Sequence, residues 1–164
     1  MDKHNQVHLQ DLDEDAALRA ILEGTATETG ERFFAALVEN LAKAMNTYGA
    51  WVTEYIEESR RLRALAFWLG GEFVHDYEYD IAGTPCEAVI EGASLVHFPD
   101  NIIELFPDNS TLKAIGAVSF MGVPLMDLDG RILGHLAVLD RRPMPKEPPH
   151  LALFRIFAAR TAAE

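Results

Sequence analysis

The sequence predicts a mixed α/β (α+β) fold, in which an antiparallel sheet carries helices on both of its faces. Three observations predict it. Residues 29–46 have apolar side chains at helical spacing, two segments rich in β-branched and aromatic residues follow at 49–56 and 61–71, and a long apolar hairpin occupies 119–140. A chain of 164 residues is long enough for one buried core and too short for two ordinary domains.

The charge of the chain restricts its partners and its compartment. The 26 acidic and 14 basic residues give a net charge of -12 and are spread along the sequence, so we expect a surface that repels nucleic acids and anionic membranes. No apolar stretch is long enough to span a bilayer, and the first residues lack the apolar centre of a signal peptide. The single cysteine, Cys86, cannot form an internal disulfide. These features predict a cytoplasmic protein with no nucleic-acid or membrane partner.

The N-terminal third contains two predicted helices and a pair of strands. Residues 1–12 are polar and aperiodic, which predicts a disordered or loosely ordered arm before a single domain that covers 13–164. Asp11 and Glu14 have capping-box spacing, and Gly24 ends a first short helix. The second helix has one apolar stripe, formed by Phe33, Phe34, Leu37, Val38, Leu41 and Met45. The charged segment EESR then joins the two strands as a turn.

The segment 72–116 changes character, because its strand signals, EYDIA and SLVHF, are brief and are separated by short helical or irregular stretches. Thr84 is placed as the cap and Pro85 as the first residue of a helix turn that Gly92 ends. The sequence therefore predicts short helices and loops here, with little regular sheet.

The hairpin at 119–140 has a DLDGR turn between two runs that are poor in polar side chains, which indicates strands covered on both faces. The first two helices and a last one at 146–164 are expected to cover one face, and the irregular segment the other. No glycine or proline ends the last helix, so we expect the chain to be excised from a longer protein.

Three stretches carry a family resemblance: GTPCEAVIEG at 83–92, HFPDNIIELFPDN at 97–109 and GAVSFMGVPLMDLDGRILGHLAVLD at 116–140. They resemble the GAF domains of bacterial histidine kinases, cyclic-dinucleotide enzymes and transcriptional activators of the formate-hydrogenlyase type. The resemblance covers 13–164. It implies a GAF-like (PAS-like) central antiparallel sheet of five or six strands, with the N- and C-terminal helices packed together on one face and a small-molecule pocket on the other.

The resemblance also implies a function and partners. A GAF domain of this kind senses a small molecule of unknown identity, pairs with a second copy through its terminal helices and passes the signal through its closing helix to an output domain in the same chain. Two alternatives stay open: a dimerisation or linker module with a vestigial pocket, and a thiol-based redox sensor that acts through Cys86.

The hairpin supplies most of the candidate ligand-binding residues. Alternate residues of a strand share a face. By similarity to GAF domains that hold a chromophore, one set on each strand is expected to face the pocket, and these sets include Val118, Phe120, Gly122, His135 and Ala137. Gly122 and Ala137 leave room beside the sheet, Phe120 can stack on a ligand, and His135 can form a hydrogen bond. Alternatively, His135 is a core histidine bonded to a backbone carbonyl.

Two further candidates lie outside the hairpin. Cys86 falls in the first turn of a predicted helix, where the helix dipole favours a thiolate, so it can be a redox or electrophile sensor. The alternative is a packing role beneath the helical roof, because free cysteine is among the most buried residues. His97, in the short SLVHF strand, is a candidate for the pocket as well.

Several cofactors and activities are not expected. Bilin-binding GAF domains attach the pigment to a Cys that precedes a His, whereas Glu87 follows Cys86, and we expect neither a bilin nor a haem. Members that reduce free methionine sulfoxide need several cysteines. The constellation of cyclic-nucleotide-binding members is missing, and so are metal-ligand spacings and catalytic motifs. The sequence thus predicts a binding domain, with no catalytic residue and no metal.

Overall fold

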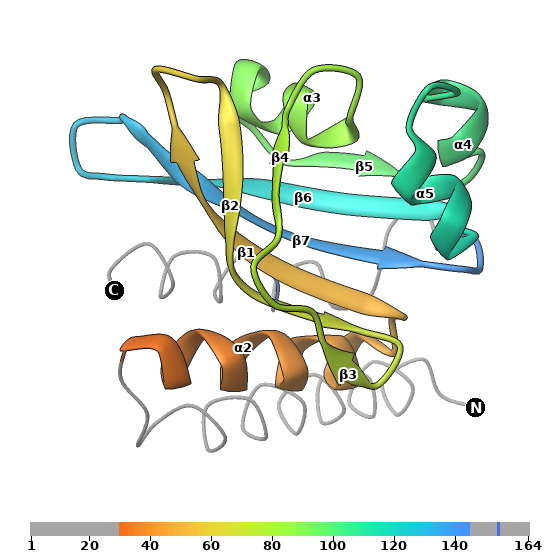
Figure 1. The fold of residues 1–164 in the computed structure, drawn as a ribbon. Helices are drawn as coiled ribbons and strands as arrows, with labels where there is room; N and C mark the ends of the chain where they lie inside the picture. The colour runs from red at the N-terminus through yellow and green to blue at the C-terminus, as the bar shows by residue number, and fades with distance from the viewer. Residues whose placement is uncertain (1–29, 145–153, 155–164) are drawn as a thin grey trace, which may run out of the picture.

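Helix α2, Gly30–Met45, packs along one face of the sheet in the computed structural model, which describes residues 30–144 and Phe154 (Figure 1). Its apolar residues recur every three or four positions and so form one stripe. Four of them are completely buried: Phe33, Leu37, Val38 and Leu41. The helix predicted at 29–46 is therefore present. The predicted first helix, the N-terminal arm and most of the last helix lie outside the described residues.

Within the described residues, the sheet has seven antiparallel strands. They are β1 (Gly49–Ile56), β2 (Arg61–Leu69), β3 (Glu72–Phe73), β4 (Glu78–Asp80), β5 (Val96–Phe98), β6 (Ser119–Met126) and β7 (Ile132–Asp140). Six follow the order β3-β2-β1-β7-β6-β5, and β4 pairs with β2 outside this path. The predicted antiparallel sheet with helices on both faces is confirmed. It has one strand more than the upper expectation of six, because the sequence did not indicate β3, which has only two residues.

The hairpin of β6 and β7 lies at the centre of the fold. Its turn is closed by the Asp127 carboxylate, which accepts hydrogen bonds from the backbone N–H groups of Asp129 and Arg131, both at 2.9 Å. Gly130 has a φ of +82°, which a residue with a Cβ rarely adopts. The strand β7 then pairs with β1 as well as β6, so that both of its edges are hydrogen-bonded.

The two faces of the sheet hold two separate apolar clusters. On the α2 face lie Met121, Leu136 and Val138, and the side chain of Phe154 is buried among them. On the opposite face lie Phe120, Ala137, Leu139, Trp51 and Phe67. The alternation follows from the two-residue period of a strand. The hairpin is apolar on both faces because each face supports its own core.

Three short helices cover the face opposite α2: α3 (Pro85–Gly92), α4 (Ile102–Leu105) and α5 (Ser110–Ile115), as Figure 1 shows. Helix α3 begins at Pro85 as predicted, but the Thr84 hydroxyl donates to the carbonyl of Ile81 at 2.6 Å instead of capping the helix. Asn109 caps α5, since its side-chain oxygen accepts from the N–H of Leu112 at 3.1 Å.

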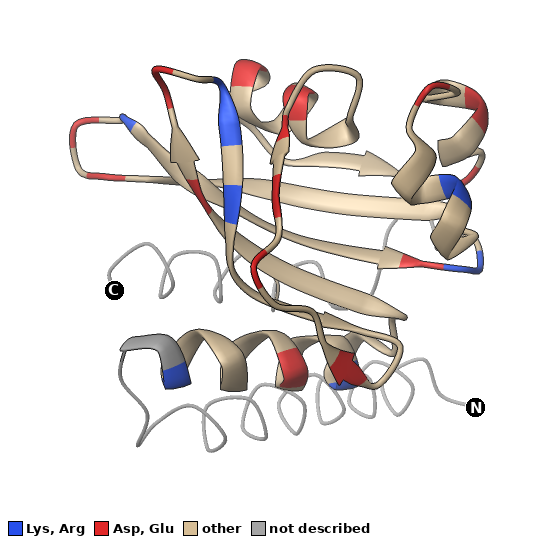
Figure 2. Ribbon diagram, in the orientation of Figure 1, with Lys and Arg blue, Asp and Glu red and all other residues tan. Residues whose placement is uncertain are grey.

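Ion pairs connect α3 and β4 to the start of β2 and the turn residue before it. Arg60 pairs with Glu87 and Glu91 of α3, and Arg61 lies 3.4 Å from Glu78 and 3.1 Å from Asp80 of β4. Figure 2 shows the basic residues of β2 beside the acidic residues of β4. These pairs are largely exposed and individually weak, yet they connect β4 to β2 and α3 to Arg60, the turn residue just before β2. No helix within the described residues is long and apolar enough to cross a membrane.

Candidate functional site

A cavity of about 250 Å³ lies between the sheet and the covering segments α3 and α5. Strands β1, β2 and β7 contribute its apolar floor, and the chain around β4 and the two helices contribute its sides. The lining residues are Trp51, Phe67, Tyr77, Tyr79, Ala82, Gly83, Thr84, Pro85, Cys86, Asp108, Asn109, Ser110, Thr111, Leu112, Ile115 and Leu139. An apolar recess with a few convergent polar groups is the usual form of a small-molecule site.

Four aromatic side chains form one continuous wall of the cavity, here called the aromatic wall: Trp51, Phe67, Tyr77 and Tyr79. The ring centroids of Trp51 and Phe67 are 5.3 Å apart, those of Phe67 and Tyr77 5.5 Å, and those of Tyr77 and Tyr79 5.1 Å. The indole N–H of Trp51 donates to the hydroxyl of Tyr79 at 3.0 Å. Each ring thus contacts the next, and the last is bonded to the first.

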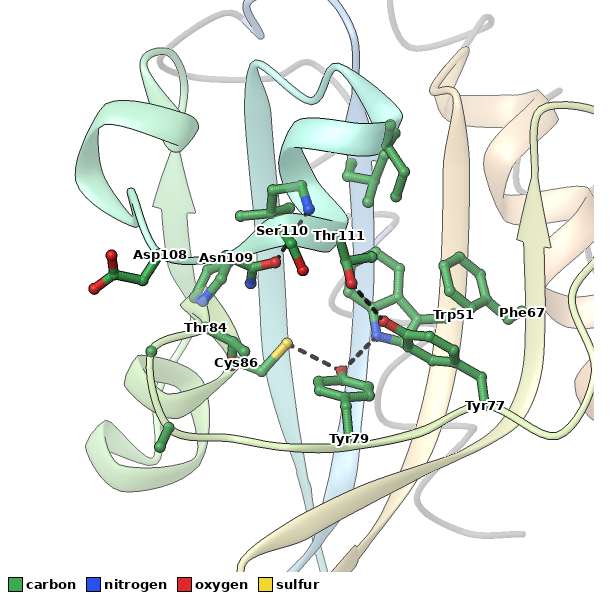
Figure 3. Close-up of a pocket in the computed structure, with 16 residues that line it drawn as sticks. Trp51, Phe67, Tyr77, Tyr79, Thr84, Cys86, Asp108, Asn109, Ser110 and Thr111 are labelled. Carbon is green, nitrogen blue, oxygen red and sulfur yellow. Dashed lines mark hydrogen bonds between the residues drawn. The ribbon is translucent and has the colours of Figure 1, made fainter.

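The opposite side of the cavity is polar. It is formed by Thr84, Cys86, Asp108, Asn109, Ser110 and Thr111. Figure 3 shows the side chains of Cys86, Ser110 and Tyr79 directed toward the same space, with Asp108 at its margin. The Tyr77 hydroxyl donates to Thr111 Oγ1 at 3.3 Å and so links the aromatic wall to α5. The cavity therefore offers aromatic surface on one side and hydroxyl, amide and thiol groups on the other.

Cys86 connects the cavity to a buried polar network. Its Sγ lies 3.2 Å from Tyr79 Oη and 3.0 Å from His135 Nε2. On the far side of the imidazole, His135 Nδ1 lies 2.6 Å from Thr53 Oγ1, which also accepts the backbone N–H of His135 at 3.1 Å. Together with Trp51, these residues form one hydrogen-bonded chain from β1 through β7 and α3 to β4.

Burial keeps the network neutral. It raises the pKa of the Cys86 thiol to about 12 and lowers the pKa of His135 to about 3. Burial also raises the pKa of Tyr79 well above its ordinary value. The arrangement of a thiol, an imidazole and a hydroxyl matches that of a cysteine nucleophile with an oriented base. Both pKa shifts, however, favour the neutral thiol and imidazole over the thiolate and imidazolium pair.

The thiolate alternative for Cys86 is therefore not favoured. The residue does occupy the first turn of α3, but it is 2% exposed, and the loss of water outweighs the attraction of the helix N-terminus. The position of Cys86 agrees with the packing alternative, because the residue is buried in the apolar cluster beneath the covering helices, and its side chain also lines the cavity.

The hairpin candidates lie on the cavity side of the sheet but mostly behind the cavity. Phe120, His135 and Ala137 are fully buried, and only Cys86 among the sequence candidates is a lining residue. His135 is a core histidine, as the alternative proposed, although its ring bonds to Thr53 and Cys86 and not to a carbonyl. Val118 is half-buried and accepts the N–H of Ile102 at 3.0 Å, away from the lining.

Gly122 and His97 are placed differently from the sequence expectation. The space beside Gly122 is filled, since a Cβ there would lie 2.9 Å from the ring of Phe120 and 3.0 Å from Val89. His97 is paired with Met121, whose side chain is in the α2-side cluster, so His97 lies on the face away from the cavity. Val96 and Phe98, the neighbours of His97 in β5, lie on the cavity side of the sheet.

The aromatic wall and the polar residues at the start of α5 were not among the candidates predicted from the sequence. Tyr77 and Tyr79 alternate in sequence and therefore share a face, which was a signal available for finding them. Trp51 and Phe67 are direct partners in the β1–β2 register. Within the described residues, no group of three His, Cys, Asp or Glu side chains is placed to hold a metal ion.

The chain belongs to the GAF domain family, whose sequence profile matches residues 29–164. GAF domains are sensory and regulatory domains of signalling proteins, so the coarse functional class implied by the resemblance of the three stretches is confirmed. No curated protein sequence matches the chain.

Solved structures agree in fold. The GAF domain of a phosphoenolpyruvate-protein phosphotransferase from Coxiella burnetii is 17% identical, with a TM-score of 0.75 over 93% of this chain and 92% of that one. The GAF domain of the Acinetobacter phosphoenolpyruvate-protein phosphotransferase is 16% identical, with a TM-score of 0.72 over 92% and 90%. Free methionine-R-sulfoxide reductase from Neisseria meningitidis, solved with its substrate, is 18% identical, with a TM-score of 0.71 over 88% and 83%. At these identities the likeness concerns the fold alone.

Proposed function

We propose that this GAF domain senses a small molecule that binds in the cavity between the sheet and helices α3 and α5, and that it acts by binding and not by catalysis. The observation that carries the proposal is the cavity itself, with an aromatic wall on one side and polar side chains on the other. A site of this form holds a ligand by apolar burial and orients it with a few hydrogen bonds. The neutral state of Cys86 and His135 supports binding over nucleophilic catalysis.

The sheet supplies a route from the ligand to the α2 face. In β1, Trp51 lines the cavity, while its neighbours Ala50 and Val52 belong to the α2-side cluster. A ligand that contacts Trp51 therefore acts, through β1, on residues packed against α2 and against Phe154. Signalling requires that the ligand bind with different affinity to two arrangements of these elements.

The same proposal includes the partners. Two copies pair through their terminal helices, and the closing helix leads into an output domain of the same chain. The position of Phe154, helical and buried against the α2-side cluster, supports a C-terminal segment that follows movements of the sheet. A change in cavity occupancy then alters the packing of the paired helices.

The test is a thermal-shift screen of a metabolite panel, combined with native mass spectrometry of the purified protein. We expect at least one metabolite to raise the melting temperature saturably or to be retained in the native spectrum. Ser110→Phe, which fills the cavity from α5, should abolish the effect. Ala114→Phe, an exposed position on the same helix outside the lining, should preserve it. The proposal would be contradicted if the native spectrum shows no retained molecule and no metabolite of the panel changes the melting temperature.

A further inference from the structure

The cavity has no basic side chain in its described lining. Among the described residues that line it, none is Lys, Arg or His, and Asp108 is the one charged side chain. The protein as a whole carries a net charge of -12. An anionic ligand such as a nucleotide phosphate or a dicarboxylate would find no basic side chain in this lining, so only neutral hydrogen-bond donors would offset the cost of its desolvation.

The aromatic wall presents few free hydrogen-bonding groups. The Trp51 N–H is bonded to the Tyr79 hydroxyl at 3.0 Å, and the Tyr77 hydroxyl is bonded to Thr111 at 3.3 Å. The wall therefore offers chiefly its π surfaces. Trp and Tyr rings carry a negative quadrupole on their faces and attract organic cations, Trp most strongly. Three of the four rings are of these two types.

The wall is also preorganised. Trp51 is 5% exposed, and its contacts with Phe67 and Tyr79 hold it against the sheet. Ring orientations that are fixed before binding cost little on association. A cavity of about 250 Å³ limits the ligand to a small molecule. Hydroxyl and amide groups of Ser110, Thr84 and Asn109 across the cavity suit a polar substituent on that ligand.

We infer that the cavity is selective for small organic cations, with an alkylated ammonium group held against the wall of Trp51, Phe67, Tyr77 and Tyr79. The inference rests on the proposed function, because it assigns a chemical class to the ligand of the same cavity. It predicts that anionic metabolites do not bind and that neutral ligands bind more weakly than cations of equal size.

Choline is a suitable probe, and its neutral carbon analogue, in which a tert-butyl group replaces the trimethylammonium group, is the matched control. The two have nearly the same shape and differ in charge. Isothermal titration calorimetry with the intact chain measures both, and sodium chloride at the same concentration controls for screening of the acidic surface. We expect saturable choline binding that is at least about tenfold tighter than binding of the neutral analogue.

Two variants locate the binding. Tyr77→Leu removes one ring of the wall, and we expect it to weaken choline binding by about tenfold. Phe98→Leu removes an aromatic ring from the same buried cluster at a position outside the lining, and its affinity for choline should equal that of the original protein. Circular dichroism of both variants establishes that each is folded before affinities are compared.

The outcomes separate the two proposals. Choline binding that fails to exceed that of the neutral analogue, or that survives Tyr77→Leu unchanged, overturns the cation assignment. If neutral or anionic metabolites from the panel bind and Ser110→Phe blocks them, the cavity is still a sensory site and only its chemical class is different. If neither choline nor any metabolite binds, both proposals fail.

Discussion

His135 Nε2 lies 3.0 Å from Cys86 Sγ, at a buried contact between β7 and the start of α3. The two residues are 49 positions apart in sequence, and Cys86 is the one of the pair that lines the cavity. The contact therefore joins the central hairpin to a covering helix directly beneath the candidate ligand site. It also explains why an apolar hairpin contains a histidine: the imidazole occupies the core as a neutral hydrogen-bonding bridge.

Alkylation of Cys86 should be slow in the native protein. Burial raises the pKa of the thiol to about 12, so the thiolate that reacts is scarce at neutral pH. We expect iodoacetamide to react on the order of a thousandfold more slowly than with an exposed cysteine. Mass spectrometry of timed samples measures the rate, and the same reaction in urea is the control. Rapid native alkylation would support the thiol-sensor alternative instead.

Acid should destabilise the protein partly through His135. The pKa of this residue is lowered from 6.5 to about 3, so the unfolded chain binds a proton in the window between these values and the folded chain does not. The contribution of neutral His135 to the free energy of unfolding is therefore fully present above the unfolded pKa. It is lost as the pH falls toward 3, by about 1.4 kcal/mol per pH unit.

Urea unfolding of the original protein and of His135→Gln, measured from neutral pH downward, isolates this effect. Glutamine keeps a donor and an acceptor but does not titrate. The stability advantage of the original protein over the variant should shrink below pH 6.5. A difference that stays constant with pH shows that His135 is not the buried neutral group described above.

Thr53 positions the imidazole, and its hydroxyl should matter more than its shape. Thr53→Val is nearly isosteric but removes the partner of His135 Nδ1 at 2.6 Å and the acceptor of the His135 N–H at 3.1 Å. We expect a loss of about 1–3 kcal/mol in the free energy of unfolding, because buried polar groups lose their partners. Thr111→Val, at an exposed position, is the control and should cost much less. Equal losses in the two variants would contradict the role given to Thr53.

Gly134 is required by the close approach of β1 and β7. A Cβ at this position would collide with the backbone carbonyl of Thr53, which cannot move without breaking the strand pairing. We expect Gly134→Ala to destabilise the protein by about 3 kcal/mol or more in urea unfolding. Gly92→Ala, where the nearest atom lies 3.7 Å away, should be tolerated. Similar stabilities for both variants would refute this account of the β1–β7 contact.

Local signals in the sequence predicted most of the secondary structure. The strand β1 at Gly49–Ile56 and helix α3 at Pro85–Gly92 occupy the predicted positions, because periodicity and end signals lie within each segment. The two-faced burial of the hairpin also followed from its composition. The two-residue strand β3 carries too short a pattern to be distinguished from a turn.

The candidate site depended on contacts that no local pattern contains. The aromatic wall forms because β4 pairs with β2, in the register that sets Tyr79 opposite Leu62, and because β1 and β2 pair Trp51 with Phe67. Strand alternation correctly assigned Phe120 and Ala137 to a face. It gave no information on how far α3 and α5 extend over that face, and so it did not separate residues behind the cavity from those that line it.

The most direct test of the central claim uses the fluorescence of Trp51. The chain has two tryptophans, and Trp68 packs in the α2-side cluster, so Trp68→Phe leaves the cavity residue as the single reporter. Titration of this variant with the metabolites of the panel should give a saturable change in emission for at least one compound. The change should disappear when Ser110→Phe is added and persist with Ala114→Phe. Emission that changes with none of the compounds, or that changes equally in the Ser110→Phe variant, would contradict a ligand site between the sheet and α5.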